Sequence, residues 1–117
     1  MWGEIQLADL NPSRGSEQAG IRPVIIVQRD NLQRFTRTVV VIPLTSNVRR
    51  AQIPGTVLIP AGEGGLTQDS VALCYQIVVL DRQRLQRHLG NLSPNFVLAL
   101  KEALKYTLEL DVFTEEN

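Results

Sequence analysis

The sequence contains little of what several kinds of specialised chemistry require. Its 117 residues include one Cys and one His. A single thiol can form neither an internal disulfide nor a cysteine zinc cage, and this fits a reducing compartment. Residues 1–4 lack the charged start and apolar stretch of a signal peptide, so we expect a cytoplasmic protein.

Long apolar runs are also missing. The longest, residues 24–27 and 39–43, have the length of strands, whereas a membrane-spanning helix needs roughly 18 or more apolar residues. Hydrophobic residues make up 44% of the chain and charged residues 21%, which is typical of a globular domain. The length of 117 residues predicts one domain over residues 1–117.

An excess of charge of either sign is absent as well. Twelve Lys and Arg residues balance twelve Asp and Glu residues, which argues against binding nucleic acid through bulk charge. The distribution is uneven: residues 1–60 hold seven Arg against four acids, or +3, and residues 61–117 hold five bases against eight acids, or −3. The N-terminal half can therefore present a local basic surface, although ordinary solvated arginines explain the same count.

Strands are expected where β-branched and apolar residues lie between turn-forming residues. The expected strands are residues 4–8, 23–28, 37–43, 55–60 and 70–80, with a turn at 43–47 and a loop at 62–65. The last strand is the longest, and one of its faces carries Val71, Leu73, Tyr75, Ile77 and Val79. Its other face is small and mixed, which fits a surface that meets a partner or forms the floor of a site. Residues 85–90 are interpreted as a short helical turn.

A helix is expected near the C-terminus. Ser93 is a suitable N-cap and Pro94 a suitable first helical residue. An apolar stripe with spacings of three and four follows, made of Phe96, Val97, Leu100, Ala103, Leu104, Thr107 and Leu108. About five short strands and a closing helix predict a mainly β fold, a small SH3-like barrel with a C-terminal helix.

One segment carries more specific information than the overall pattern. Residues 15–24, Gly-Ser-Glu-Gln-Ala-Gly-Ile-Arg-Pro-Val, together with Gly3-Glu4 and residues 9–12, resemble the opening of the MazF/PemK toxin family. The resemblance continues in order through residues 43–46, 69–71, 76–77 and 81–85. Each short motif is weakly specific, but their joint order and spacing cover nearly the whole chain.

This resemblance implies a PemK/CcdB-like toxin fold, a homodimer, and a sequence-specific endoribonuclease that cuts single-stranded RNA without a metal. In such a reaction the 2′-hydroxyl attacks the adjacent phosphate, leaving a 2′,3′-cyclic phosphate and a 5′-hydroxyl. The family also implies a cognate antitoxin whose C-terminal segment occupies the RNA groove. No cofactor is expected, because no residue cluster has metal-ligand spacing and no glycine-rich run follows the phosphate-loop pattern.

Three residues are catalytic candidates, two of them at positions that match the family. Arg22 stands at the family's arginine position, where a guanidinium holds the phosphate's developing charge. Thr45 matches the catalytic threonine, whose hydroxyl can donate to the phosphate. Glu17 is the candidate proton acceptor or substrate-positioning carboxylate. Each has an ordinary structural explanation too: Arg22 paired with Glu17 on the surface, and Thr45 and Ser46 capping a turn.

Four further residues are expected to contact RNA: Ser16, Gln18, Ser46 and Gln76. Some family members carry a His where this chain has Ser16, and an Arg and an Asp where this chain has Leu73 and Tyr75. That acid–base set is absent here, so the mechanism is expected to depend on Arg22 and Thr45.

Two reactive side chains are set aside. His88 lies far in sequence from the motif and is interpreted as a surface residue, although a histidine is a common general acid or base. Cys74 is interpreted as a packed strand residue, since no basic neighbour is placed to activate it.

Two other functions remain open at this point. The same fold also serves CcdB-like toxins, which poison DNA gyrase by contact rather than by chemistry. A toxin that keeps its fold and antitoxin binding but has lost its activity is the third possibility.

Overall fold

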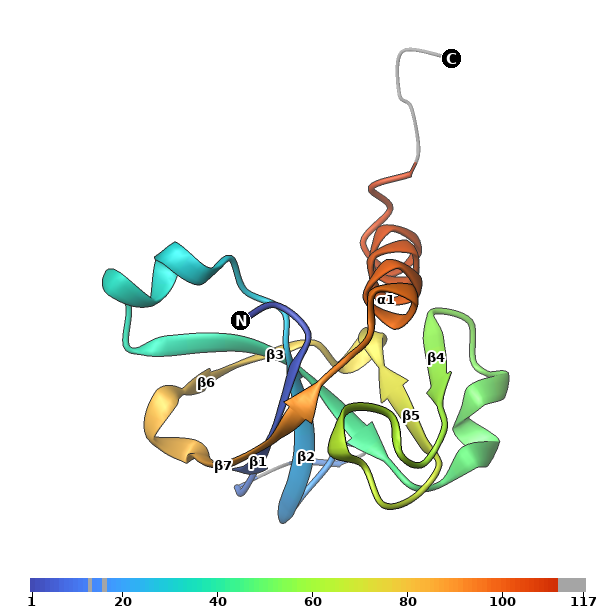
Figure 1. The fold of residues 1–117 in the computed structure, drawn as a ribbon, viewed down its shortest axis with the longest axis horizontal. Helices are drawn as coiled ribbons and strands as arrows, with labels where there is room; N and C mark the ends of the chain where they lie inside the picture. The colour runs from blue at the N-terminus through green and yellow to red at the C-terminus, as the bar shows by residue number, and fades with distance from the viewer. Residues whose placement is uncertain (13, 16, 112–117) are drawn as a thin grey trace.

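The computed structural model describes residues 1–12, 14–15 and 17–111. This part of the chain forms seven strands, several short 3-10 helices and one α-helix (Figure 1). In chain order these are β1 (Glu4–Asp9), β2 (Ile21–Ile26), β3 (Thr38–Thr45), β4 (Thr56–Ile59), β5 (Ser70–Leu73), β6 (Val78–Asp81), β7 (Leu85–Asn91) and α1 (Pro94–Thr107). The expected mainly β fold with a C-terminal helix is confirmed.

The strands form one curved antiparallel sheet in the order β4-β5-β3-β2-β1-β7, with β6 pairing β3 beside this path. The long strand β3 organises the sheet, because it pairs with β2, β5 and β6 along different parts of its length. In the described residues the outer strands β4 and β7 do not pair with each other, so the small barrel is open rather than closed.

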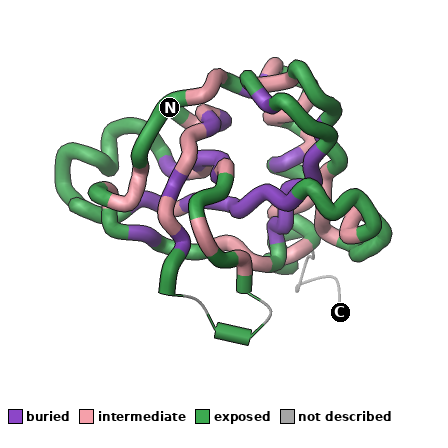
Figure 2. Tube along the Cα trace, turned by 90° about the horizontal axis from the view of Figure 1, so that it is seen from below, coloured by how far each residue is buried: buried purple, intermediate pink, exposed green. Residues whose placement is uncertain are grey.

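Both faces of the central strands are buried, which explains why β2 and β3 appear as continuous apolar runs in the sequence. Ile25 and Ile42 face one core, together with Leu100 of α1, whereas Val24 and Val41 face a second core on the other side. Figure 2 shows this burial following the strands, while the segment between β1 and β2 projects away from them and its described residues are largely exposed.

The α-helix begins as expected. Pro94 is its first residue and Ser93 stands at the N-cap position, but the Ser93 side chain makes no capping hydrogen bond. The Ser93 backbone amide instead donates to the Glu63 carboxylate at 2.6 Å. Leu100 is fully buried at the centre of the expected stripe. No helix of the described residues is long and apolar enough to cross a membrane.

The expected strand over residues 70–80 is wrong, because it is interrupted by a 3-10 turn at Cys74–Gln76. Both β5 and β6 run beside β3, but Ala72 pairs with Leu44 and Val78 with Val41. Between these two pairs, the segment that carries β5 and β6 contains six residue steps, from 72 to 78, whereas β3 contains only three, from 44 to 41. The turn takes up the excess, and it lifts Tyr75 and Gln76 out of the sheet.

Two smaller expectations are also wrong. Residues 85–90 belong to strand β7, which pairs with β1, and do not form a helical turn. Strand β3 continues past Pro43 to Thr45. Pro43 lies between the part of β3 that pairs with β6 and the part that pairs with β5, so its missing N–H breaks no ladder hydrogen bond on that side.

Candidate active site

The motif segment between β1 and β2 is closed at its base by backbone hydrogen bonds. The Leu10 amide donates to the Gly20 carbonyl at 2.9 Å, and the Gly20 amide donates to the Asn11 side chain at 3.0 Å. Gly20 has a φ of 79°, a left-handed conformation that glycine adopts without strain. The chain therefore enters β2 in a fixed direction, with Arg22 as its second residue.

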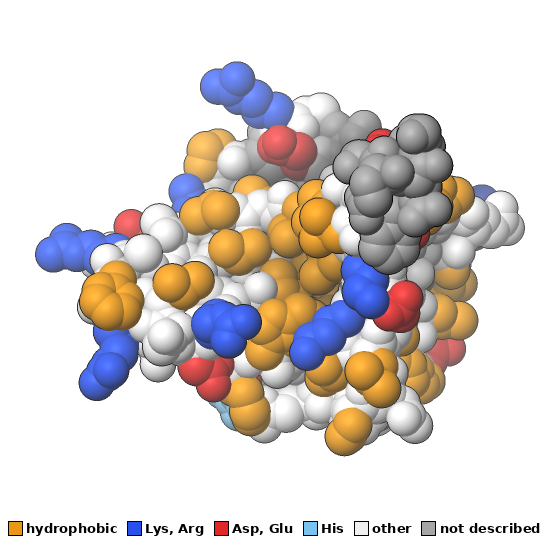
Figure 3. Space-filling view, turned by 90° about the horizontal axis from the view of Figure 1, so that it is seen from above, with side chains coloured by type: hydrophobic (Ala, Val, Ile, Leu, Met, Phe, Trp, Pro, Cys, Tyr) orange, Lys and Arg blue, Asp and Glu red, His pale blue; other side chains and the backbone are white. Residues whose placement is uncertain are grey.

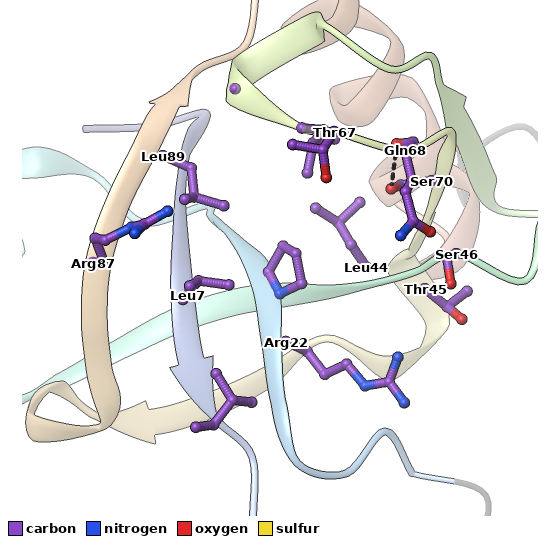
Figure 4. A pocket seen from close by; sticks show the side chains of 14 residues that line it. Leu7, Arg22, Leu44, Thr45, Ser46, Thr67, Gln68, Ser70, Arg87 and Leu89 are labelled. Carbon is purple, nitrogen blue, oxygen red and sulfur yellow. Dashed lines mark hydrogen bonds between the residues drawn. The ribbon is translucent and has the colours of Figure 1, made fainter.

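The register of β2 and β3 brings Arg22 toward Thr45. Val24 pairs with Pro43 and Ile25 with Ile42, so paired residue numbers add to 67. The hydrogen-bonded ladder ends at Val24, but the same register extended by two residues sets Arg22 opposite Thr45. Both residues line a pocket of about 340 Å³ (Figure 4).

The two side chains are held differently. Thr45 is 7% exposed, and its hydroxyl oxygen accepts a hydrogen bond from the Asn47 amide at 3.2 Å. Accepting this bond does not use the hydroxyl proton, which stays free to donate. Arg22 is exposed, and its Nε donates to the Ala19 carbonyl at 3.0 Å. Figure 4 shows its side chain extending along the edge of the pocket toward the side where Thr45 lies.

Ser46 lines the same pocket, next to Thr45. Glu17, Gln18 and Gln76 instead line a neighbouring pocket of about 610 Å³. The Glu17 carboxylate accepts a hydrogen bond from the Arg14 amide at 2.7 Å, within its own loop. Ser16 lies outside the described residues. The structure thus brings Arg22, Thr45 and Ser46 together and places Glu17 beside them rather than among them.

Gln76 connects the motif segment to the rest of the molecule. Its side-chain oxygen accepts a hydrogen bond from the Gln18 amide at 3.2 Å. Gln76 was expected in a continuous strand, but it reaches Gln18 because the 3-10 turn carries it out of the sheet.

Comparison with known proteins identifies the family. Residues 2–108 match the model of the PemK-like, MazF-like toxin of type II toxin-antitoxin systems. The chain belongs to this family. A relative, the endoribonuclease MazF of Staphylococcus epidermidis, is 40% identical to this toxin over 111 residues, which are 95% of this chain and 92% of the relative.

Solved structures of MazF-like proteins share the toxin's fold. The Mycobacterium tuberculosis toxin MazF-mt6 superposes with a TM-score of 0.76 at 28% identity, covering 91% of this chain and 96% of that one. A mycobacterial endoribonuclease solved with its cognate antitoxin gives a TM-score of 0.77 at 26% identity, covering 94% and 95%. The Deinococcus radiodurans MazF, at 24% identity and a TM-score of 0.78, shows the same fold. These matches do not favour the gyrase-poison alternative.

The toxin's pocket also contains polar residues that were not among the expected site residues. They are Thr67, Gln68, Ser70 and Arg87. Ser70 is 5% exposed, and its hydroxyl donates to the Gln68 carbonyl at 3.0 Å (Figure 4). Sequence spacing could not reveal them, because Thr67 and Gln68 lie in the loop before β5, Ser70 begins β5, and Arg87 lies on β7, all far from residues 15–24.

The two residues set aside in the sequence are explained by their surroundings. Cys74 is fully buried, and this burial raises the pKa of its thiol from 9.0 to about 11, so the nucleophilic thiolate is disfavoured. His88 is exposed on β7, and its Nδ1 lies 2.7 Å from the Glu4 carboxylate. Burial alone would raise the pKa of Glu4, but its hydrogen bonds to His88, Gln6 and the N-terminal amine outweigh burial and lower it.

Proposed function

We propose that this MazF-like toxin is a sequence-specific endoribonuclease that cuts single-stranded RNA without a metal ion. Attack by the 2′-hydroxyl on the adjacent phosphate leaves a 2′,3′-cyclic phosphate and a 5′-hydroxyl. The supporting observation is the pocket of about 340 Å³ that a guanidinium and a largely buried hydroxyl share, Arg22 from the start of β2 and Thr45 from the end of β3.

The pocket is suited to the charge that develops on the phosphate. The outer nitrogens of Arg22 can donate two parallel hydrogen bonds to non-bridging oxygens. The Thr45 hydroxyl, whose lone pair is engaged by Asn47, can donate its proton to the same phosphate. Donors fixed before the reaction stabilise the transition state without reorganising, and losing one such donor costs about 100- to 1000-fold in rate.

Proton transfer is assigned to a group outside this pocket. The described residues that line it include no Asp, Glu, His or Lys. Glu17, on the motif segment, is the carboxylate we propose as proton acceptor or as a group that positions the substrate. Glu17 lines the neighbouring pocket. As a positioning group it would contact RNA that extends over both pockets, whereas as proton acceptor it would have to be carried by its loop to the 2′-hydroxyl beside the scissile phosphate.

The proposed RNA contacts follow the two pockets. Ser46 lies beside the phosphate site, whereas Gln18 and Gln76 lie together in the neighbouring pocket, where amides can read base edges. Ser16 is proposed to contact RNA from the same segment as Gln18.

We further propose that the toxin is a cytoplasmic homodimer neutralised by a cognate antitoxin. The mycobacterial endoribonuclease with a similar fold was solved with its antitoxin. A short acidic antitoxin that folds on binding can cover the motif segment and both pockets with its C-terminal segment.

The test is cleavage of a defined RNA by the purified toxin in the presence of a chelator, with analysis of the new ends. We expect a 2′,3′-cyclic phosphate and a 5′-hydroxyl, and a rate at least about 100-fold lower for Arg22→Ala at unchanged thermal stability. Cleavage that the chelator abolishes, or that survives Arg22→Ala unchanged, contradicts the proposal. Capture of gyrase by a toxin that leaves RNA intact would support the CcdB-like alternative instead.

A further inference from the structure

The pocket that holds Arg22 and Thr45 contains a second arginine, at its opposite end. Arg87 comes from β7, and residues alternate along a strand, so Arg87 and Leu89 face the pocket while His88 faces Glu4 on the other side. Figure 4 shows the Arg87 and Arg22 side chains on opposite sides of the pocket, with Leu7 between them.

The sheet fixes the spacing of the two ends. Leu7 pairs with Pro23 on one side and with Arg87 on the other, so these three residues form a row across β2, β1 and β7. Neighbouring strands lie about 4.8 Å apart, which puts the Arg87 backbone about 10 Å from that of Pro23. A stacked nucleic acid strand advances about 3.4 Å per phosphate. A strand lying across the row therefore presents different phosphates to Arg22 and to Arg87.

The electrostatics of the pocket favour a polyanion. Arg87 is exposed, and its side chain makes no hydrogen bond or ion pair with any residue that the structure describes. None of the described lining residues is acidic. The adjoining loop between β4 and β5 carries two acids, and both are engaged elsewhere: the Asp69 carboxylate accepts a hydrogen bond from the Ala61 amide at 2.8 Å, and the Glu63 carboxylate accepts one from the Ser93 amide at 2.6 Å. Two cations thus share one pocket without a compensating carboxylate.

The wall next to Arg87 is built to hold its shape. Gly65 adopts a φ of 79°, and a side chain there would run into the Leu89 backbone carbonyl. The loop that carries Gly65, Thr67 and Gln68 therefore packs directly against β7. All of these side chains line the pocket, but Figure 4 shows Thr67 between the two ends and Gln68 beside Ser70, on the side away from Arg87.

We propose that Arg87, with Thr67 on the adjoining wall, forms a second phosphate subsite that binds a phosphate of the RNA flanking the scissile one. This inference rests on the proposed ribonuclease function. Arg87 is then a positioning residue: it holds the strand in register over the apolar row of Leu7 and Pro23, and it does not take part in bond cleavage. Its loss should raise KM and leave kcat nearly unchanged.

The first experiment compares wild type, Arg87→Gln and Arg87→Lys in two measurements. Cleavage kinetics on a cleavable RNA give KM and kcat, and binding to the same RNA with a 2′-deoxy group at the scissile position, which prevents cleavage, gives Kd. The matched control is Arg34→Gln, because Arg34 is an exposed arginine of the 3-10 helix Asp30–Arg34 and does not line the pocket. We expect Arg87→Gln to raise KM and Kd about 10-fold. The slope of log Kd against log salt should fall by about 0.7. Arg87→Lys should restore part of the affinity, and Arg34→Gln should change neither constant.

The decisive arm removes the charge from the RNA instead of the protein. Uncleavable RNAs that each carry one neutral methylphosphonate are bound to wild type and to Arg87→Gln. We expect the Arg87→Gln penalty to vanish for one flanking position and to persist at all others. A merely structural role of Arg87 would give a penalty that does not depend on which phosphate is neutral, and this result would overturn the proposal.

The remaining outcomes separate this proposal from the function on which it rests. Wild type that cuts RNA, with KM unchanged in Arg87→Gln, overturns the subsite alone. If Arg87→Gln weakens binding of poly-L-glutamate and leaves RNA binding unchanged, the arginine belongs to a protein-binding surface and the subsite is overturned. Wild type that neither binds nor cuts RNA overturns both.

Discussion

At the scale of single residues, the two central side chains of the pocket differ in burial and in how they are held. Thr45 is nearly buried and is fixed through Asn47, whereas Arg22 is exposed and is held only at Nε. A fixed hydroxyl and an adaptable guanidinium suit a site that must first admit a strand and then close on one phosphate. In the proposed mechanism, the threonine would define where the phosphate lies and the arginine would follow it.

Glu17 provides the first prediction at this scale. The structure places its carboxylate in the neighbouring pocket, so we expect Glu17→Gln to slow cleavage less than Arg22→Ala does. Single-turnover rates of the two variants, measured on one RNA, make the comparison. Glu17→Gln alters charge with little change of shape, and unfolding curves control for stability. An equal or larger loss in Glu17→Gln would show that the segment moves its carboxylate to the scissile phosphate.

Cys74 provides a pH-dependent prediction. Burial raises the pKa of its thiol from the ordinary value of 9.0, expected in the unfolded chain, to about 11 in the folded protein. The unfolded state therefore loses its proton first, so this group's contribution to stability is complete below about pH 9 and is lost as the pH rises toward 11. The loss is on the order of 2 kcal/mol. Urea unfolding of wild type and Cys74→Ala between pH 8 and 11 measures it, and a parallel decline in both proteins would contradict the prediction.

At the scale of elements, the sequence predicts best where one physical pattern dominates. Strands β1 to β4 and helix α1 lie within a few residues of their expected ranges, because apolar runs, turn residues and the Ser93-Pro94 start act locally. The break at Cys74–Gln76 was not predictable. Strand β5 is buried on both faces, so its sequence lacks the alternation of apolar and polar residues that would mark a strand end. The three residues in excess of those in β3 become apparent only from the pairing of β5 and β6 with β3.

The same distinction applies to the site. The resemblance to the MazF/PemK family selected Arg22, Thr45 and Ser46, which share a pocket. Neither propensity nor spacing could show that Arg22 meets Thr45, since this depends on the register of β2 with β3. Arg87 was missed for a related reason: it reaches the pocket only because β7 returns beside β1, and residues 85–90 had been interpreted as a helical turn.

The contact between the Gly65 loop and β7 gives a prediction for an element. Gly65→Ala places a side chain at a positive φ and against the Leu89 carbonyl, so backbone must move. We expect the free energy of unfolding to fall by about 3 kcal/mol, followed in urea through the fluorescence of Trp2. Gly62→Ala is the matched control: its φ of 95° carries similar strain, but open space surrounds the added Cβ. Equal losses in both variants would mean that the loop does not pack on β7 as described.

At the scale of the whole molecule, charge and apolar surface are distributed differently. Figure 3 shows Lys and Arg side chains spread over the face around α1 rather than gathered in one patch. Large apolar side chains on and after the helix remain exposed, among them Leu98 at 61%, Tyr106 at 57% and Leu110 at 68%. Soluble monomers seldom leave so much apolar surface uncovered in one region.

This exposed surface leads to the prediction for the assembly. We expect light scattering to give twice the mass of one chain, with a second copy covering the outer side of α1. The double variant Tyr106→Glu and Leu110→Glu should shift the protein toward a monomer at low micromolar concentration while its circular dichroism stays unchanged. Wild type that remains monomeric at high concentration, or a variant that stays dimeric, would contradict this location of the interface.

The measurement that tests the account most directly is a double-mutant cycle of single-turnover cleavage rates for wild type, Arg22→Ala, Thr45→Val and the double variant. If the guanidinium and the hydroxyl act on one phosphate, each single variant loses about 100-fold, and the double variant loses much less than the product of the two. Losses that simply multiply would show that the two side chains act independently, and the shared catalytic pocket would be contradicted.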